Sequence, residues 1–172
     1  MKSKRAVLLF GIVLLLAIGT YPLAAQKPAV KAASMSHPLE GTWKLKVAQS
    51  KLSPNQPDAP KEDTMVFRVA GDHFEYTETG MQKDGKPIAE KWTFYPNGGV
   101  VKALQSAAPE GESFVETVIE PGNRYLTILK DGKQIGVSHL VISRDGKSLT
   151  ITDKGTDAKG KPYESVSVYN RQ

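Results

Sequence analysis

The sequence predicts an all-β protein, an antiparallel up-and-down meander that closes into a barrel of eight to ten strands. Apolar and polar residues alternate with a period of two along most of the chain, as expected for a sheet with one face on a core. Turn signals of the Asp-Gly and Asn-Gly type separate these runs. After residue 39, no segment sustains the apolar period of a helix longer than two turns.

The first 25 residues have the three parts of a secretory signal peptide. Lys2, Lys4 and Arg5 form a basic start, and an apolar stretch runs from Ala6 to Ile18. This stretch is shorter than the roughly 20 apolar residues that a membrane-spanning helix needs. We therefore expect cleavage after Ala25, export to the periplasm or the outside of the cell, and no stable membrane span after cleavage.

Residues 26–38 have the composition of a flexible tether, and residues 39–172 are expected to form one barrel domain. The chain has no cysteine, which excludes disulfides and a lipid-anchored cysteine. Three basic residues lie in the leader, so the formal net charge of +5 falls to +2 in the remainder. The remaining charges are interspersed, which argues against a nucleic-acid partner. We expect a monomer.

The strands are expected in chain order from their alternation. Trp43 and Leu45 alternate with lysines in the first run, and Met65 and Phe67 lead the second. In the last run, Val166 and Val168 are the residues expected to face the core. The expected ranges are about 41–48, 63–70, 73–82, 88–95, 99–105, 113–120, 124–130, 134–143, 148–154 and 162–170.

Nearly every connection between these runs has the length of a hairpin. The exception runs from Ser50 to Lys61, where three prolines exclude a regular strand or helix through its centre. A meander of about ten strands protects its edges best by closing into a barrel. A two-sheet sandwich with Greek-key crossings is the alternative, and it usually needs longer connections.

Gly41 and Trp43 open the first strand, and Arg171 ends the last one. This arrangement resembles the lipocalins and the wider calycin superfamily, and it implies that Arg171 stacks on Trp43. The stretches GTWKLKVAQSKLSP and SRDGKSLTITDKGTDAKGKPYESVSVYNRQ are similar to a group of small secreted lipocalin-like bacterial proteins without an assigned activity. The resemblance covers residues 39 to 172. Neither the helix that packs on typical lipocalins nor the helix pair of the fatty-acid carriers has a counterpart here.

Two functions remain open for such a barrel. It could carry a small apolar or amphipathic molecule in its interior, or it could be an envelope or interaction domain with a filled core. Arg68 and His139 interrupt apolar runs and are the candidates for anchoring a carboxylate. The interior has an apolar lining if half of the aromatic residues point inward, and these are Trp43, Phe67, Phe74, Tyr76, Trp92, Phe94, Phe114, Tyr125 and Tyr169. The ligand-binding candidates in the barrel interior are Phe67, Arg68, Tyr76, Trp92, Phe94 and His139.

Enzyme chemistry finds no support in the sequence. A Gly-x-Ser-x-Gly elbow and cysteine are absent, and no phosphate-binding glycine loop follows a strand. Glu75 and Glu78, like Glu116 and Glu120, are expected to be solvated surface carboxylates. We therefore expect no catalytic residues and no cofactor.

The three histidines suggest weaker alternatives. His37 lies at the edge of the tether and is expected to be exposed. His73 and Glu75 could share a strand face as two metal ligands, but a third ligand is not apparent, so we expect a solvated turn. His139 is expected to be a hydrogen-bonded structural residue, with haem ligation as a minority alternative.

Overall fold

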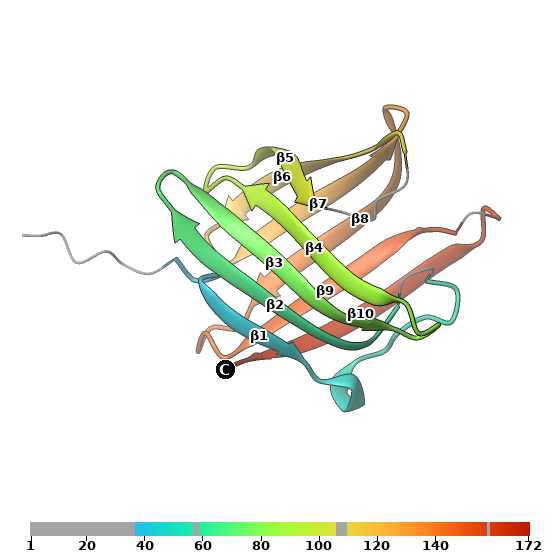
Figure 1. Cartoon of the computed structure of the whole chain (residues 1–172), viewed down its shortest axis with the longest axis horizontal. Coiled ribbons are helices and arrows are strands. Elements are labelled where there is room, and N and C mark those ends of the chain that lie inside the picture. The colour runs from blue at the N-terminus through green and yellow to red at the C-terminus, as the bar shows by residue number, and fades with distance from the viewer. Residues whose placement is uncertain (1–36, 57–58, 106–109, 158) are drawn as a thin grey trace, which may run out of the picture. The chain divides into compact units, whose positions relative to one another are not determined.

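The computed structural model describes residues 37–172 apart from residues 57–58, 106–109 and 158. The expected signal peptide and almost all of the expected tether lie outside the described residues. The described part contains ten strands and one short 3₁₀ helix (Figure 1). They are β1 (Gly41–Leu45), η1 (Val47–Gln49), β2 (Pro60–Ala70), β3 (His73–Gln82), β4 (Pro87–Phe94), β5 (Gly99–Gln105), β6 (Glu112–Glu120), β7 (Asn123–Lys130), β8 (Lys133–Ile142), β9 (Ser148–Thr156) and β10 (Pro162–Arg171).

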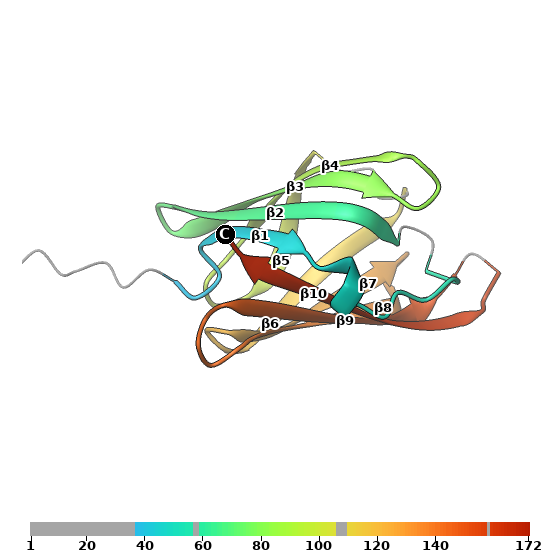
Figure 2. The same ribbon diagram turned by 90° about the horizontal axis from the view of Figure 1, so that it is seen from below.

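The strands form a closed antiparallel barrel. Each pairs with its neighbours in the chain, and β1 pairs with both β2 and β10. Viewed at a right angle to Figure 1, β2 to β4 form one wall, and β9 and β10 lie on the facing side (Figure 2). The predicted all-β meander is therefore confirmed. In the described residues, no helix has the length and apolar character needed to cross a membrane.

The expected strand ranges agree with the observed ones to within three residues. β1 is shorter than expected, because η1 follows it and leaves Val47 52% exposed. Turn chemistry explains the tight hairpins. Asp131 and Gly132 connect β7 to β8 with φ values of 48° and 76°, the left-handed conformation that such a turn requires.

The apolar face of most strands points inward, as the alternation predicts. The strand β10 is different, because Ser165, Ser167 and Tyr169 are buried while Val166 and Val168 lie on the opposite face. The prediction that these valines face the core is wrong. Tyr169 sets the alternation by packing inside, and a period of two then places the two serines inside as well. The core consists of Leu39, Trp43, Leu45, Met65, Phe67, Phe74, Tyr76, Trp92, Phe94, Val101, Leu140, Leu149 and Tyr169.

The segment after β1 extends the wall of the barrel. β1 pairs with β10 only up to Leu45 and Tyr169. Beyond this point the N–H of Lys46 donates to the Val168 carbonyl, and Lys51 exchanges two main-chain hydrogen bonds with Val166. The first long loop therefore takes the place of β1 along the remaining edge of β10.

Candidate functional site

One end of the barrel is closed by the chain segment that enters it. Trp43 is fully buried, and its indole Nε1 donates a hydrogen bond of 2.8 Å to the Leu39 carbonyl. The Arg171 guanidinium carbon lies 4.2 Å from the centroid of the Trp43 ring, and its nitrogens donate to the carbonyls of Pro38, Glu40 and Gly146. The stacking implied by the sequence resemblance is confirmed. We call this the plugged end.

A buried ion pair lies inside the barrel beside the plugged end. Arg124 is 1% exposed and donates a 2.7 Å hydrogen bond to Glu116, which is 4% exposed. His37 contacts the same guanidinium at 3.4 Å and packs against Phe74, with a ring-centroid distance of 4.4 Å. Burial and the Arg124 charge lower the pKa of His37 to about 4. The expectations of an exposed His37 and a solvated Glu116 are therefore wrong.

Aromatic side chains fill much of the interior. Phe67 lies 4.8 Å from Tyr76 and 6.3 Å from Phe94 between ring centroids, and Trp92 meets Phe114 edge to face at 4.6 Å. Such tilted contacts stabilise a core beyond the area that they bury. Four ligand-binding candidates, Phe67, Tyr76, Trp92 and Phe94, thus lie inside the barrel and contact one another or their neighbours. Their role in binding stays a prediction.

Arg68 and His139 are not in the interior. Arg68 is exposed next to the inward Phe67, and successive residues of a strand point to opposite faces. His139 is the neighbour of buried Leu140 and stacks on Tyr125, with centroids 4.1 Å apart and an angle of 5° between the rings. Tyr125 is 37% exposed, so this pair lies on the outer face. The expected interior positions of Arg68 and His139 are therefore wrong.

Three carboxyl groups from adjacent strands lie on the inner face instead. They are Asp63 of β2, Glu78 of β3 and Glu90 of β4, and we call them the acidic wall. Glu78 and Glu90 are direct cross-strand partners, an arrangement that is unfavourable when both are charged. Asp63 is 3% exposed, and Glu78 and Glu90 are half-buried.

Aromatic donors hold each carboxyl in place. The Tyr169 hydroxyl donates to Oδ2 of Asp63 at 2.7 Å, and the Trp92 indole donates to Oε2 of Glu90 at 2.8 Å. The Tyr76 hydroxyl donates to Glu78. The chain therefore orients the acidic wall with side chains that are themselves packed in the core.

Burial and mutual repulsion disfavour the charged form of the acidic wall. Burial raises the pKa of Glu78, and the neighbouring Asp63 charge adds to this effect. Burial also raises the pKa of Asp63, with Glu90 contributing and the hydrogen bond from Tyr169 opposing. Buried carboxyls with raised pKa values that share an interior are a mark of functional sites as well as of structural networks.

Another part of the inner face is apolar and accessible. Four inward side chains there are only partly buried, and we call them the apolar wall: Phe114, Leu126, Ile128 and Ile151. A cross-strand glycine pair, Gly136 and Gly155, lies beside Ile128. Neighbouring side chains pack closely over these glycines, because a Cβ at Gly136 would lie 3.3 Å from Ile128 and one at Gly155 would lie 2.9 Å from the Tyr163 hydroxyl.

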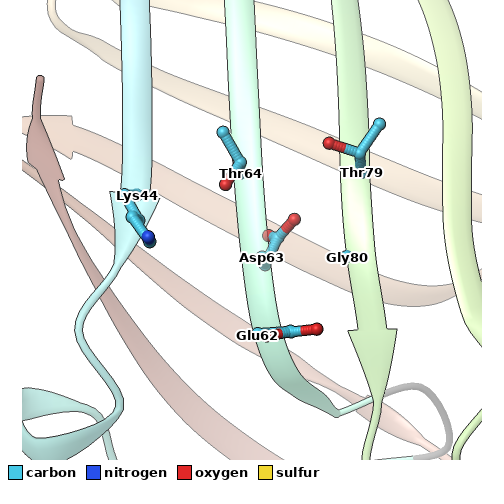
Figure 3. A pocket seen from close by; sticks show the side chains of 6 residues that line it. All are labelled: Lys44, Glu62, Asp63, Thr64, Thr79 and Gly80. Carbon is cyan, nitrogen blue, oxygen red and sulfur yellow. The ribbon is translucent and has the colours of Figure 1, made fainter.

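A separate pocket of about 230 Å³ lies on β1, β2 and β3 (Figure 3). Lys44 and Glu62, which line it, are exposed, so it is a groove on the outer surface. A bulge in β2 between Pro60 and Glu62 shapes it. A Cβ atom at Gly80 would lie 2.2 Å from the Glu62 carbonyl oxygen, so the bulge requires glycine there. The lining residues are Lys44, Glu62, Asp63, Thr64, Thr79 and Gly80.

His73 contacts the side chain of Asp72 at 3.1 Å, at the turn between β2 and β3. Within the described ranges, no three His, Cys, Asp or Glu side chains are grouped as a metal site would require.

The acidic wall was missed by the sequence analysis, although its signal was present. Glu78 stands two residues after Tyr76, and Glu90 two residues before Trp92, so each shares a strand face with an aromatic residue of the predicted lining. The general preference of carboxylates for the surface outweighed this periodicity.

No protein-family model matches the chain, and no curated protein matches it. Solved β-barrels are similar at low identity. Lobster apocrustacyanin A1 is 16% identical with a TM-score of 0.42, over 80% of this chain and 63% of that one, so this chain spans less than two thirds of the crustacyanin. Zebrafish ileal bile acid-binding protein, complexed with cholic acid, is 17% identical with a TM-score of 0.45, over 78% and 99%. Rv2717c from M. tuberculosis is 18% identical with a TM-score of 0.44, over 85% and 98%.

Proposed function

We propose that this chain is an exported binding protein whose barrel holds a small, largely apolar molecule between the acidic wall and the apolar wall. The observation that carries the proposal is the partial burial of the apolar wall. Phe114, Leu126 and Ile151 pack against the core on one side, but solvent still reaches them, so a ligand would supply contacts that the chain leaves unmade. The acidic wall would provide the few polar groups that orient a ligand in such a site.

The competing function is a non-binding envelope or interaction domain with a filled core. The packed aromatic side chains near Phe67 and Phe94 are compatible with it. The two functions differ in one measurable respect, because only an interior that accepts a ligand is stabilised by one. A ligand that binds the native state alone raises stability by about 2.7 kcal/mol at 100 times its dissociation constant.

The test is a thermal-denaturation screen of the mature chain against uncharged, cationic and anionic apolar molecules, with native mass spectrometry of the purified protein. We expect at least one class to raise the melting temperature by several degrees. Ile151→Trp fills the space beside the apolar wall and should abolish the shift. Val100→Trp is the matched control, because Val100 is 69% exposed. If no class of molecule raises the melting temperature and no molecule co-purifies, the result contradicts the binding proposal and favours a non-binding domain with a filled core.

The proposed location rests on the leader alone. Mass spectrometry of the periplasmic or secreted fraction should find a chain that begins near Gln26. A chain that still begins with Met1 and stays in the membrane fraction would contradict export without affecting the binding proposal.

A further inference from the structure

We infer that the ligand carries a cationic nitrogen, an ammonium or amidinium joined to an apolar body, and that the acidic wall binds this nitrogen. The inference rests on the proposed function and names the chemical class of its ligand. It replaces the sequence-based expectation that Arg68 or His139 anchors a carboxylate, since both lie on the outer face.

Carboxyl groups converge at the acidic wall. Glu78 and Glu90 face the same interior from directly paired positions, and Asp63 comes from the strand on the other side of Glu78. Burial is the main cause of the raised pKa values of Asp63 and Glu78, and Glu90 raises both of them further. A positive group placed among them would relieve repulsion that the fold itself maintains.

The acidic wall contains a buried acceptor without a hydrogen bond of full geometry. Oδ2 of Asp63 accepts the Tyr169 hydrogen bond, but Oδ1 is buried and receives no hydrogen bond from any donor in the described residues. The Glu78 carboxyl and the Thr64 amide are close enough to lower the pKa of Asp63, but neither meets Oδ1 at full hydrogen-bond geometry. Buried acceptors nearly always have a donor, and two adjacent carboxyls need a proton or a cation between them. A ligand ammonium has three N–H donors and could supply both the hydrogen bond and the charge.

The inner surface next to the acidic wall is apolar. The acidic wall shares the interior with the apolar wall, through the contact of Trp92 and Phe114. A molecule that fills this space would meet carboxyls at one side and hydrocarbon at the other. An anionic amphiphile such as a fatty acid would bring one more negative charge to the acidic wall, so a cationic amphiphile has the complementary chemistry.

The test uses three probes of equal chain length, octylamine, octanol and octanoate, at pH 7.5 with the mature full-length chain. Binding is followed by thermal shift and by tryptophan fluorescence, to which Trp92 beside Glu90 should respond. We expect octylamine to bind at least about tenfold more tightly than octanol, as charge-assisted hydrogen bonds allow. Octanoate should bind more weakly than octanol.

Charge-neutral variants separate the acidic wall from the rest of the site. Asp63→Asn, Glu78→Gln and Glu90→Gln should each weaken octylamine binding by about tenfold and leave octanol binding unchanged. Octanol binding also reports that a variant is folded. Because there are three variants, the test still works if one of them fails to fold. Glu62→Gln is the matched control, since Glu62 is exposed beside Asp63 and is not part of the acidic wall.

Octanol or octanoate binding as tightly as octylamine would overturn the inference and leave the proposed function intact. Equal octylamine affinity in all three variants would also overturn it. Failure of all three probes to bind, with no co-purified molecule, would overturn the inference together with the proposed function.

Discussion

Arg171 stacks on Trp43 at 4.2 Å and so fastens the last strand of the barrel to the first. The same guanidinium donates hydrogen bonds to the carbonyls of Pro38 and Glu40, which precede β1. One side chain near the end of the chain therefore holds the entering segment across the plugged end. Its stabilising effect combines an aromatic contact with several hydrogen bonds to main-chain carbonyls.

We expect Arg171→Met to lower the free energy of unfolding by about 2–4 kcal/mol, because the cation–π contact and two or more charge-assisted hydrogen bonds are lost. The unfolding free energy of Arg171→Lys should lie between those of Arg171→Met and the wild type, since lysine keeps the charge but lacks the planar guanidinium group. Urea denaturation measures the differences. Exposed Arg144→Met is the control, expected within about 0.5 kcal/mol of the wild type.

The Arg124–Glu116 pair should show strong coupling. Arg124→Leu leaves the Glu116 carboxylate buried without its partner, and we expect a loss of about 3–5 kcal/mol in unfolding free energy. The double variant Arg124→Leu/Glu116→Leu removes both charges and should be more stable than either single variant. A double-mutant cycle by urea denaturation gives the coupling energy. Additive losses would contradict the assignment of a mutually dependent buried pair.

Gly80→Ala should destabilise the barrel by about 1–3 kcal/mol, because the new Cβ meets the backbone of the β2 bulge and the strand must shift. Gly122→Ala is the matched control, since a Cβ there makes an ordinary 3.4 Å contact with Ile142. Thermal denaturation compares the two variants. Equal melting temperatures for both would show that the bulge adjusts without strain.

The acidic wall should make stability fall as the pH rises. The folded pKa of Glu78 is raised above its ordinary value of 4.5, so the folded state binds more protons than the unfolded state above that pH. The contribution of Glu78 is therefore most favourable below about pH 4.5 and is lost as the pH rises through the folded pKa. Glu78→Gln should flatten this dependence and be at least as stable as the wild type at pH 7.

The measurement is urea denaturation of the wild type and Glu78→Gln between pH 4 and 8. His37 has the opposite effect on the pH dependence of stability. Its pKa is lowered in the folded state, so stability falls as the pH drops from 6.5 toward about 4. The difference between wild type and variant cancels the His37 contribution. A pH-independent difference would contradict the raised pKa of Glu78.

The fold was predictable because its signals are local. The Asp-Gly turns and the alternation around Trp43 and Leu149 depend only on neighbouring residues, and they located strands to within three residues. The prediction for β10 failed because the more apolar residues, Val166 and Val168, lie on the outer face, while Ser165 and Ser167 lie inside with Tyr169. Tyr169 determines which face of β10 points inward, and its hydrogen-bond partner, Asp63, is distant in sequence.

The candidate site was predictable only in part. The aromatic lining followed from residue type, but Arg68 was assigned to the interior together with its neighbour Phe67, which a period of two does not allow. Glu116 and Glu78 were taken as surface residues because their partners, Arg124 and Asp63, come from other strands. Buried charge depends on tertiary partners, and a single sequence does not reveal them.

The brevity of β1 implies a place where the barrel opens locally. β1 has five residues, whereas β2 and β10 have eleven and ten. Beyond Leu45, a few hydrogen bonds hold β10 to the loop: main-chain bonds of Lys46 and Lys51, and bonds that involve the Ser50 and Ser165 hydroxyls. Opening this seam breaks few bonds and exposes little of the core, so its free energy lies well below that of global unfolding. In hydrogen exchange, the amides of Lys46 and Lys51 should lose protection long before those of β2 and β3.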